Sequence, residues 1–212
     1  MKKVITIVLI LLFIVFISTS FASDIDISLS HQAAVDLCAY PSVREGVIDL
    51  LYLYVDELWH RGMYERIFPV LKLITTISPS DVEAWTLGGW FLINGIVPKL
   101  SGKEKERVIN YAVEFMKKGI KANPEDARLY MELAMYYYNR QDYENALYYL
   151  ESIEVPYPSF HFLHIKAHTY QKLGRTEEAI KVWETVKKFF PEMNDVADRF
   201  ITELKSDIEK NN

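Results

Sequence analysis

Cysteine is almost missing from this chain. Its 212 residues include a single cysteine, Cys38. One cysteine cannot form a disulfide within the chain, so the folded state must be held together by packing. Cys38 lies in an apolar-rich stretch, Ala33–Tyr40, and we interpret it as a small buried hydrophobic residue.

Glycine and proline are also scarce, and no alternating run of apolar and polar residues is long enough to predict a β-strand. The chain has 8 glycines and 8 prolines, and most of them lie between segments whose apolar residues recur with the period of a helix. The predicted fold class is therefore all-α. We expect helices at 30–39, 43–60, 64–77, 81–94, 104–121, 126–139, 143–152, 159–172, 176–189 and 192–209. Ser42 with Glu45 and Ser80 with Glu83 have the spacing of capping boxes.

A basic surface is missing as well. The chain has 24 Lys and Arg against 29 Asp and Glu, which gives a formal net charge of −5. The Lys and Arg residues do not cluster. Because binding to nucleic-acid phosphates requires a basic face, we expect no nucleic-acid partner.

The common catalytic motifs are absent from the sequence. It contains no Gly-x-Ser-x-Gly elbow, no His-Glu-x-x-His, no glycine-rich phosphate loop and no paired cysteine motif. Acidic pairs such as Glu177-Glu178 are expected at helix starts, where the helix dipole favours negative charge. We predict that the chain has no catalytic residues, is not an enzyme and uses no cofactor.

Three of the five histidines are spaced for one helical face. His161, His164 and His168 follow one another at steps of three and four residues. The spacing fits a solvated or half-packed polar face, and it also fits a metal-binding group or a pH-responsive patch. No cysteine or acidic residue at a matching spacing completes a metal site within this helix. We therefore predict no metal site and keep these histidines as its only candidate.

The N-terminus has the pattern of a signal peptide. Lys2 and Lys3 precede an uninterrupted apolar run, Val4–Ile17, and small residues follow at Ser20 and Ala22. We predict a signal peptide over residues 1–22 and export to the periplasm or cell envelope, with no membrane span left after cleavage. The alternative is that residues 4–22 are retained and anchor the protein in the inner membrane, because 19 residues are just long enough to cross it.

An internal repeat runs through most of the chain. Four sets of residues share steps of four, three and five, and each set ends on a proline that closes a helix. Pro124 follows Pro79 by 45 residues, Pro158 follows Pro124 by 34, and Pro191 follows Pro158 by 33. The sets are Ile67, Leu71, Ile74, Pro79; Ala112, Met116, Gly119, Pro124; Ala146, Leu150, Ile153, Pro158; and Ala179, Trp183, Val186, Pro191.

The last of these units resembles a tetratricopeptide repeat. The residues that carry the resemblance are Ala167, Tyr170, Leu173-Gly174-Arg175, Glu178-Ala179-Ile180 and Pro191. The resemblance implies a right-handed α-solenoid of about four helix–turn–helix units with a helix capping each end. The implied organisation is a tail and capping helix at 23–47, units at 48–81, 82–126, 127–159 and 160–192, and a C-terminal capping helix at 193–212.

The second unit is longer than the others. Its extra residues, 94–105, contain Gly95, Pro98 and Gly102, and we expect them to form a loop between the two helices. The insertion is explained by neutral drift, because long loops cost little entropy, and the functional alternative is a contact loop at the rim of the solenoid.

The resemblance also implies a function. In this family the first helix of each unit lines a concave groove that binds a peptide or a partner protein. We therefore predict a scaffold, adaptor or assembly factor, and the alternative is a metal-binding or enzymatic envelope protein that uses the three histidines. The sequence does not define the partner or the oligomeric state. When the units are aligned with the family pattern, the residues at the groove-lining positions are Tyr52, Asp56, Trp59, Thr86, Trp90, Ile93, Met131, Met135, Tyr138, His164, His168 and Gln171.

Overall fold

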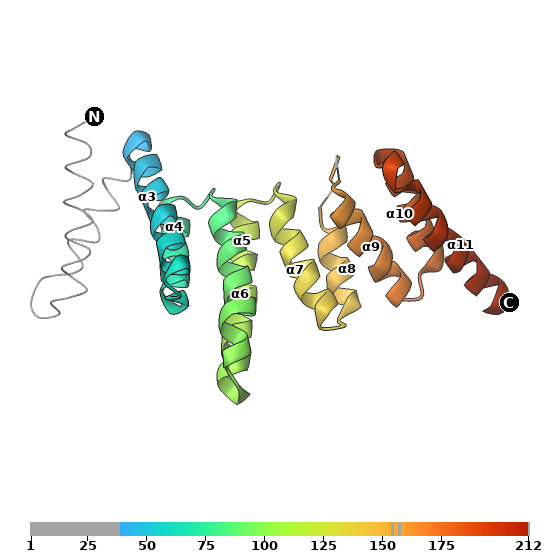
Figure 1. The fold of residues 1–212 in the computed structure, drawn as a ribbon, viewed down its shortest axis with the longest axis horizontal. Coiled ribbons are helices and arrows are strands. Elements are labelled where there is room, and N and C mark those ends of the chain that lie inside the picture. The colour runs from blue at the N-terminus through green and yellow to red at the C-terminus, as the bar shows by residue number, and fades with distance from the viewer. Residues whose placement is uncertain (1–38, 154, 157, 212) are drawn as a thin grey trace, which may run out of the picture. The chain divides into compact units, whose positions relative to one another are not determined.

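The computed structural model describes residues 39–153, 155–156 and 158–211. These residues form helices and no strands, which confirms the all-α fold class. Figure 1 shows the helices in chain order. The signal peptide, the helix expected at 30–39 and Cys38 lie outside the described residues. The chain divides into two compact units, and the boundary between them in the sequence falls between Ile109 and Asn110.

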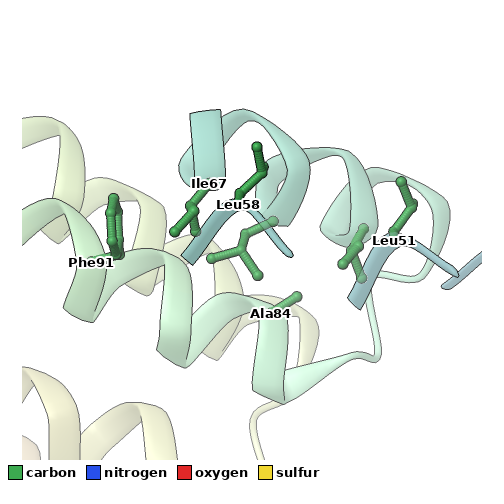
Figure 2. Close-up of a cluster of buried hydrophobic side chains, with 7 residues drawn as sticks. Leu51, Leu58, Ile67, Ala84 and Phe91 are labelled. Atoms are coloured by element: carbon green, nitrogen blue, oxygen red, sulfur yellow. The ribbon is translucent and has the colours of Figure 1, made fainter. Parts of the chain in front are cut away.

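The described part of the first unit begins with three helices whose buried side chains form one cluster. The helices are α3 (Pro41–His60), α4 (Ile67–Ile77) and α5 (Val82–Phe91), with a short 3-10 turn, Tyr64–Arg66, before α4. Figure 2 shows Leu51 and Leu58 of α3 next to side chains of α4 and α5. The cluster consists of Leu51, Leu58, Ile67, Leu71, Ile74, Ala84 and Phe91.

The second unit consists of helices that pack pairwise. They are α7 (Ala127–Asn139), α8 (Tyr143–Glu151), α9 (Phe160–Lys172), α10 (Thr176–Phe189) and, after a 3-10 turn at Pro191–Met193, α11 (Asn194–Asn211). Helix α6 (Gly102–Ala122) runs from the first unit into the second. Alanines fill the close contacts within this unit. Ala134, Ala146, Ala167 and Ala179 are fully buried.

The residues expected to form a loop at 94–105 are mostly helical, so this prediction is wrong. A single π-helical turn, Leu92–Ile96, continues α5, a 3-10 turn follows at Val97–Lys99, and α6 begins at Gly102. Pro98 occupies the start of the 3-10 turn, where its missing N–H costs no hydrogen bond. Gly95 and Pro98 therefore lie within tight helical turns and Gly102 begins α6, so the three residues do not mark an open loop.

The predicted capping boxes are also wrong. Helix α3 begins at Pro41 and no side chain caps it. Helix α5 is capped by Asp81, whose Oδ1 accepts a hydrogen bond from the Ala84 N–H at 2.9 Å. Asp126, Asp142 and Ser159 cap α7, α8 and α9 in the same way. A carboxylate at the N-cap also interacts favourably with the helix dipole, which explains why Asp81 caps α5 rather than Ser80.

Three helices end with the same backbone motif. At the end of α3, the Gly62 N–H donates to the carbonyl of Trp59 and the Met63 N–H donates to the carbonyl of Leu58. This is the Schellman arrangement, with a left-handed residue just beyond the helix. The ends of α7 and α9 repeat these bonds, with Gln141 and Gly174 in the left-handed position. The common ending supports the internal repeat that the sequence predicts.

Gln141 is the exception among these three residues, because its φ of 63° is strained for a side chain with a Cβ atom. We expect Gln141→Gly to raise the free energy of unfolding by about 1 kcal/mol, since glycine removes this strain. Gly174→Ala is the matched control. A Cβ there would meet no atom within 4 Å, so the φ of 71° alone should make it destabilising. Urea unfolding measures both variants, and a loss of stability in Gln141→Gly would contradict the strain at this position.

Candidate protein-binding surface

One face of α3 carries acidic and aromatic side chains. Glu45, Asp49, Tyr52, Asp56 and Trp59 follow one another at steps of four and three residues, so they lie on one side of the helix. All of them are exposed except Tyr52, which is half-buried. The Trp59 side chain is 47% exposed, which is unusual for the largest apolar residue.

Helix α5 adds a second exposed stripe. Glu83, Leu87 and Trp90 are exposed and share a face, and Trp90 is 43% exposed. The other two residues predicted for this helix, Thr86 and Ile93, are half-buried. Leu87 was not predicted from the sequence, although its three-residue spacing from Trp90 was a signal that could have found it.

Two contacts hold helices α3 and α5 side by side. At the start of α5, the Tyr52 hydroxyl donates a hydrogen bond to Asp81 Oδ1 at 2.8 Å, the same oxygen that caps the helix. At the end of α5, the Tyr64 ring lies between Trp59, with ring centroids 5.2 Å apart, and Phe91, at 6.4 Å. Because Asp81 begins α5 and Phe91 ends it, α3 and α5 run in the same direction.

We refer to these two stripes together as the α3–α5 face. It consists of Glu45, Asp49, Tyr52, Asp56 and Trp59 on α3 and Glu83, Leu87 and Trp90 on α5. Lys99 borders it near Trp59, with its ammonium 5.3 Å from the centroid of the Tyr64 ring. Large exposed aromatic side chains of this kind supply much of the binding energy at protein interfaces.

In the second unit, the groove residues predicted on α7 are less exposed than those of the α3–α5 face. Met131, Met135 and Tyr138 are all half-buried. The Tyr138 ring packs edge-on against Tyr143 of α8, with centroids 5.4 Å apart. Burial, with a smaller contribution from Tyr143, raises the pKa of Tyr138 above its ordinary value. Tyr138 therefore takes part in packing between α7 and α8.

The predicted residues on α9 face neighbouring helices. His164 and His168 are half-buried, with ring centroids 4.5 Å apart, and both rings meet Trp183 of α10 edge-on. His168 also contacts Phe200 of α11 at 5.0 Å, and its Nδ1 is 3.1 Å from Oε1 of Gln171. These two histidines therefore pack in the junction of α9 with α10 and α11.

The histidines do not form a recognisable metal site. The part of the chain that the structure describes holds no group of three or more His, Cys, Asp or Glu residues arranged to bind a metal ion. His161 is exposed, whereas the other two histidines are packed against aromatic rings. In the part of the chain that the structure describes, every helix is too short or too polar to cross a bilayer.

Comparison with known proteins identifies the fold. Residues 160–191 match the sequence model of the tetratricopeptide repeat. The structure is similar to that of TTC0263, a thermophilic TPR protein of Thermus thermophilus, with a TM-score of 0.53 and 16% identity over 82% of this chain and 91% of that chain. The sequence matches none of the curated proteins with which it was compared.

Structures of MamA mutants are similar to a comparable degree. A point mutant of MamA gives a TM-score of 0.52 at 16% identity, covering 78% of this chain and 90% of that chain. The MamA RS-1 ArsTM double mutant gives 0.52 at 18% identity, covering 78% and 96%. At these identities the likeness defines the fold alone. The chain thus matches the tetratricopeptide repeat over residues 160–191, and its fold is similar to that of a TPR protein.

Proposed function

We propose that this chain is a non-catalytic binding module of the bacterial cell envelope, and that it holds a peptide or a helix of a partner protein against the α3–α5 face. The observation that carries the proposal is the pair of exposed tryptophans, Trp59 and Trp90, on two helices that lie side by side. Two indole rings exposed to water cost hydrophobic free energy that a bound partner would recover.

The proposed compartment rests on the N-terminal sequence. The basic pair Lys2 and Lys3, the apolar run Val4–Ile17 and the small residues Ser20 and Ala22 support export. Intact-mass analysis of the protein from fractionated native cells tests this proposal. We expect a soluble envelope species that begins at Ser23, and a full-length species in the membrane fraction would instead support retention of residues 4–22 as an anchor.

Trp90 is the residue that tests the binding surface. A photo-crosslinking side chain placed on the α3–α5 face first recovers the partner from native cells. We then expect Trp90→Ala to weaken binding of that partner by about 2 kcal/mol, or roughly thirtyfold in Kd, because large aromatic anchors dominate interface energies. The melting temperature should change little, since the side chain is 43% exposed.

Tyr148→Ala provides a matched control for Trp90→Ala. Tyr148 is also a large exposed aromatic residue, but it lies on α8 and outside the α3–α5 face. We expect it to leave the affinity unchanged. If Trp90→Ala instead lowers stability strongly while each folded molecule binds as before, Trp90 belongs to the core and the proposed surface is wrong.

A further inference from the structure

The charges on the two helices that carry Trp59 and Trp90 are one-sided. Helix α3 contains four acidic residues, Glu45, Asp49, Asp56 and Glu57, and a single basic Lys or Arg residue, Arg44. Arg44 is half-buried, whereas the four carboxylates are exposed. Helix α5 contains one acidic residue, Glu83, and neither Lys nor Arg. Apart from Lys99, which borders the face near Trp59, the exposed charge beside the two tryptophans is therefore mainly negative.

The arrangement of these carboxylates works against the stability of α3. Glu45 and Asp49 are four residues apart, and like charges at this spacing repel each other on a helix. Asp56 lies in the last turns of α3, where the helix dipole disfavours negative charge. A sequence that breaks local rules without a gain in stability commonly does so at a functional site.

Within the described residues, local partners compensate for little of this charge. Asp56 has the exposed His60 as its partner, with His60 Nδ1 3.4 Å from Asp56 Oδ2. Arg61 instead pairs with Glu57, which points away from the face. Exposed pairs of this kind contribute little to stability. The face thus carries an acidic row on α3, which consists of Glu45, Asp49 and Asp56. It also carries the apolar surface of Trp59, Leu87 and Trp90.

We propose that the α3–α5 face binds a basic amphipathic peptide segment of a partner protein. Its apolar side chains cover Trp59, Leu87 and Trp90, and its Lys or Arg side chains meet Glu45, Asp49 and Asp56. This inference rests on the proposed function and adds the chemistry of the partner. The acidic row fixes orientation and speeds association, because complementary charge chiefly affects specificity and encounter rates.

A selection from a phage-displayed library of random peptides tests the inference without knowledge of the natural partner. The chain without residues 1–22 is the bait. The Trp90→Ala variant is used for counter-selection, so that the retained peptides depend on the face. We expect the retained peptides to carry several Lys or Arg residues together with aromatic or aliphatic residues, and to have a positive net charge. Retained peptides that are neutral or acidic would overturn the inference.

Neighbouring residues on α3 give a matched pair of charge reversals. Asp56→Lys should weaken binding of the retained peptides by about tenfold, and the loss should shrink as salt is raised. Glu57→Lys makes the same change in net charge one residue further along, off the face, and should change the Kd less than about twofold. Circular dichroism checks that both variants are folded, and Asp49→Lys replaces Asp56→Lys if the latter is not.

The outcomes separate this inference from the proposed function. If Asp56→Lys and Glu57→Lys have equal effects while Trp90→Ala still abolishes binding, the face binds peptides but not through its acidic row, and only the inference fails. If every peptide that binds the chain also binds the Trp90→Ala variant and is lost in the counter-selection, the proposed surface fails too. If the chain binds no peptide at all, the inference is overturned, and a dimer in sedimentation velocity that Asp56→Lys dissociates would make the face an interface between two copies.

Discussion

Replacement of Trp183 by alanine is expected to lower the free energy of unfolding by about 3–5 kcal/mol. Trp183 is fully buried, and its ring stacks on Phe200 of α11 with centroids 4.5 Å apart and an interplanar angle of 13°. His164 and His168 meet its edges from α9. Truncation therefore opens a cavity where α9, α10 and α11 meet.

Trp183→Phe should cost far less, about 1.5 kcal/mol or less. Nε1 of Trp183 is buried and has no hydrogen-bond partner within the described part of the chain, so the indole contributes through packing. Trp59→Ala is the control at an exposed tryptophan and should change stability by less than about 1 kcal/mol. Urea unfolding followed by circular dichroism measures all three variants. If Trp183→Phe and Trp183→Ala lower the free energy of unfolding equally, the indole N–H makes a stabilising hydrogen bond.

Acidification is expected to destabilise the junction of α9 with α10 and α11. Burial is the main cause that lowers the pKa of His164, with smaller contributions from His168 and His161. Burial also lowers the pKa of His168, partly opposed by its bond with Gln171, and Lys172 lowers it further.

The surrounding charges do not favour protonation of these rings. The neighbours from the other elements are aromatic, namely Trp183 of α10 and Phe200 of α11. On α11, the Arg199 guanidinium lies 5.0 Å from the centroid of the Phe200 ring, which in turn contacts His168. Because both folded-state pKa values lie below the unfolded value of about 6.5, the unfolded chain binds more protons below neutral pH.

Stability should therefore be constant above about pH 7 and should fall as the pH drops through about 6.5 toward the lower folded-state values. Melting temperatures between pH 8 and pH 5 measure this effect before most carboxylates are protonated. In the double variant His164→Gln/His168→Gln, the melting temperature should depend much less on pH. His60→Gln, at an exposed histidine on α3, should keep the wild-type pH dependence. A double variant with the wild-type pH dependence would assign the acid sensitivity to other groups.

Most helices could be predicted from the sequence because their signals are local. The helices expected at 143–152 and 176–189 correspond closely to α8 and α10. Each has an apolar stripe of helical period and a breaker residue after it. The repeat boundaries remain a prediction, since the described helices do not by themselves fix where one unit ends.

The insertion and the surface residues could not be predicted, because tertiary contacts decide them. Gly95 suggested a loop, yet a Cβ at this position would lie 3.1 Å from the Phe91 ring, so glycine allows a tight π-helical turn here. On α5, Leu87 is exposed whereas Thr86 is half-buried. The packing of His168 depends on Phe200, which lies 32 residues further along the chain.

The Schellman endings of α3, α7 and α9 also bear on which residues such a turn tolerates. Their hydrogen bonds join main-chain atoms only, so the turn restricts few side chains besides the one in the left-handed position. Glycine stands in that position at Gly62 and Gly174, whereas glutamine stands there at Gln141. The family model matches at 160–191, where the turn reads Leu173-Gly174-Arg175. The same backbone turn thus forms on three different local sequences.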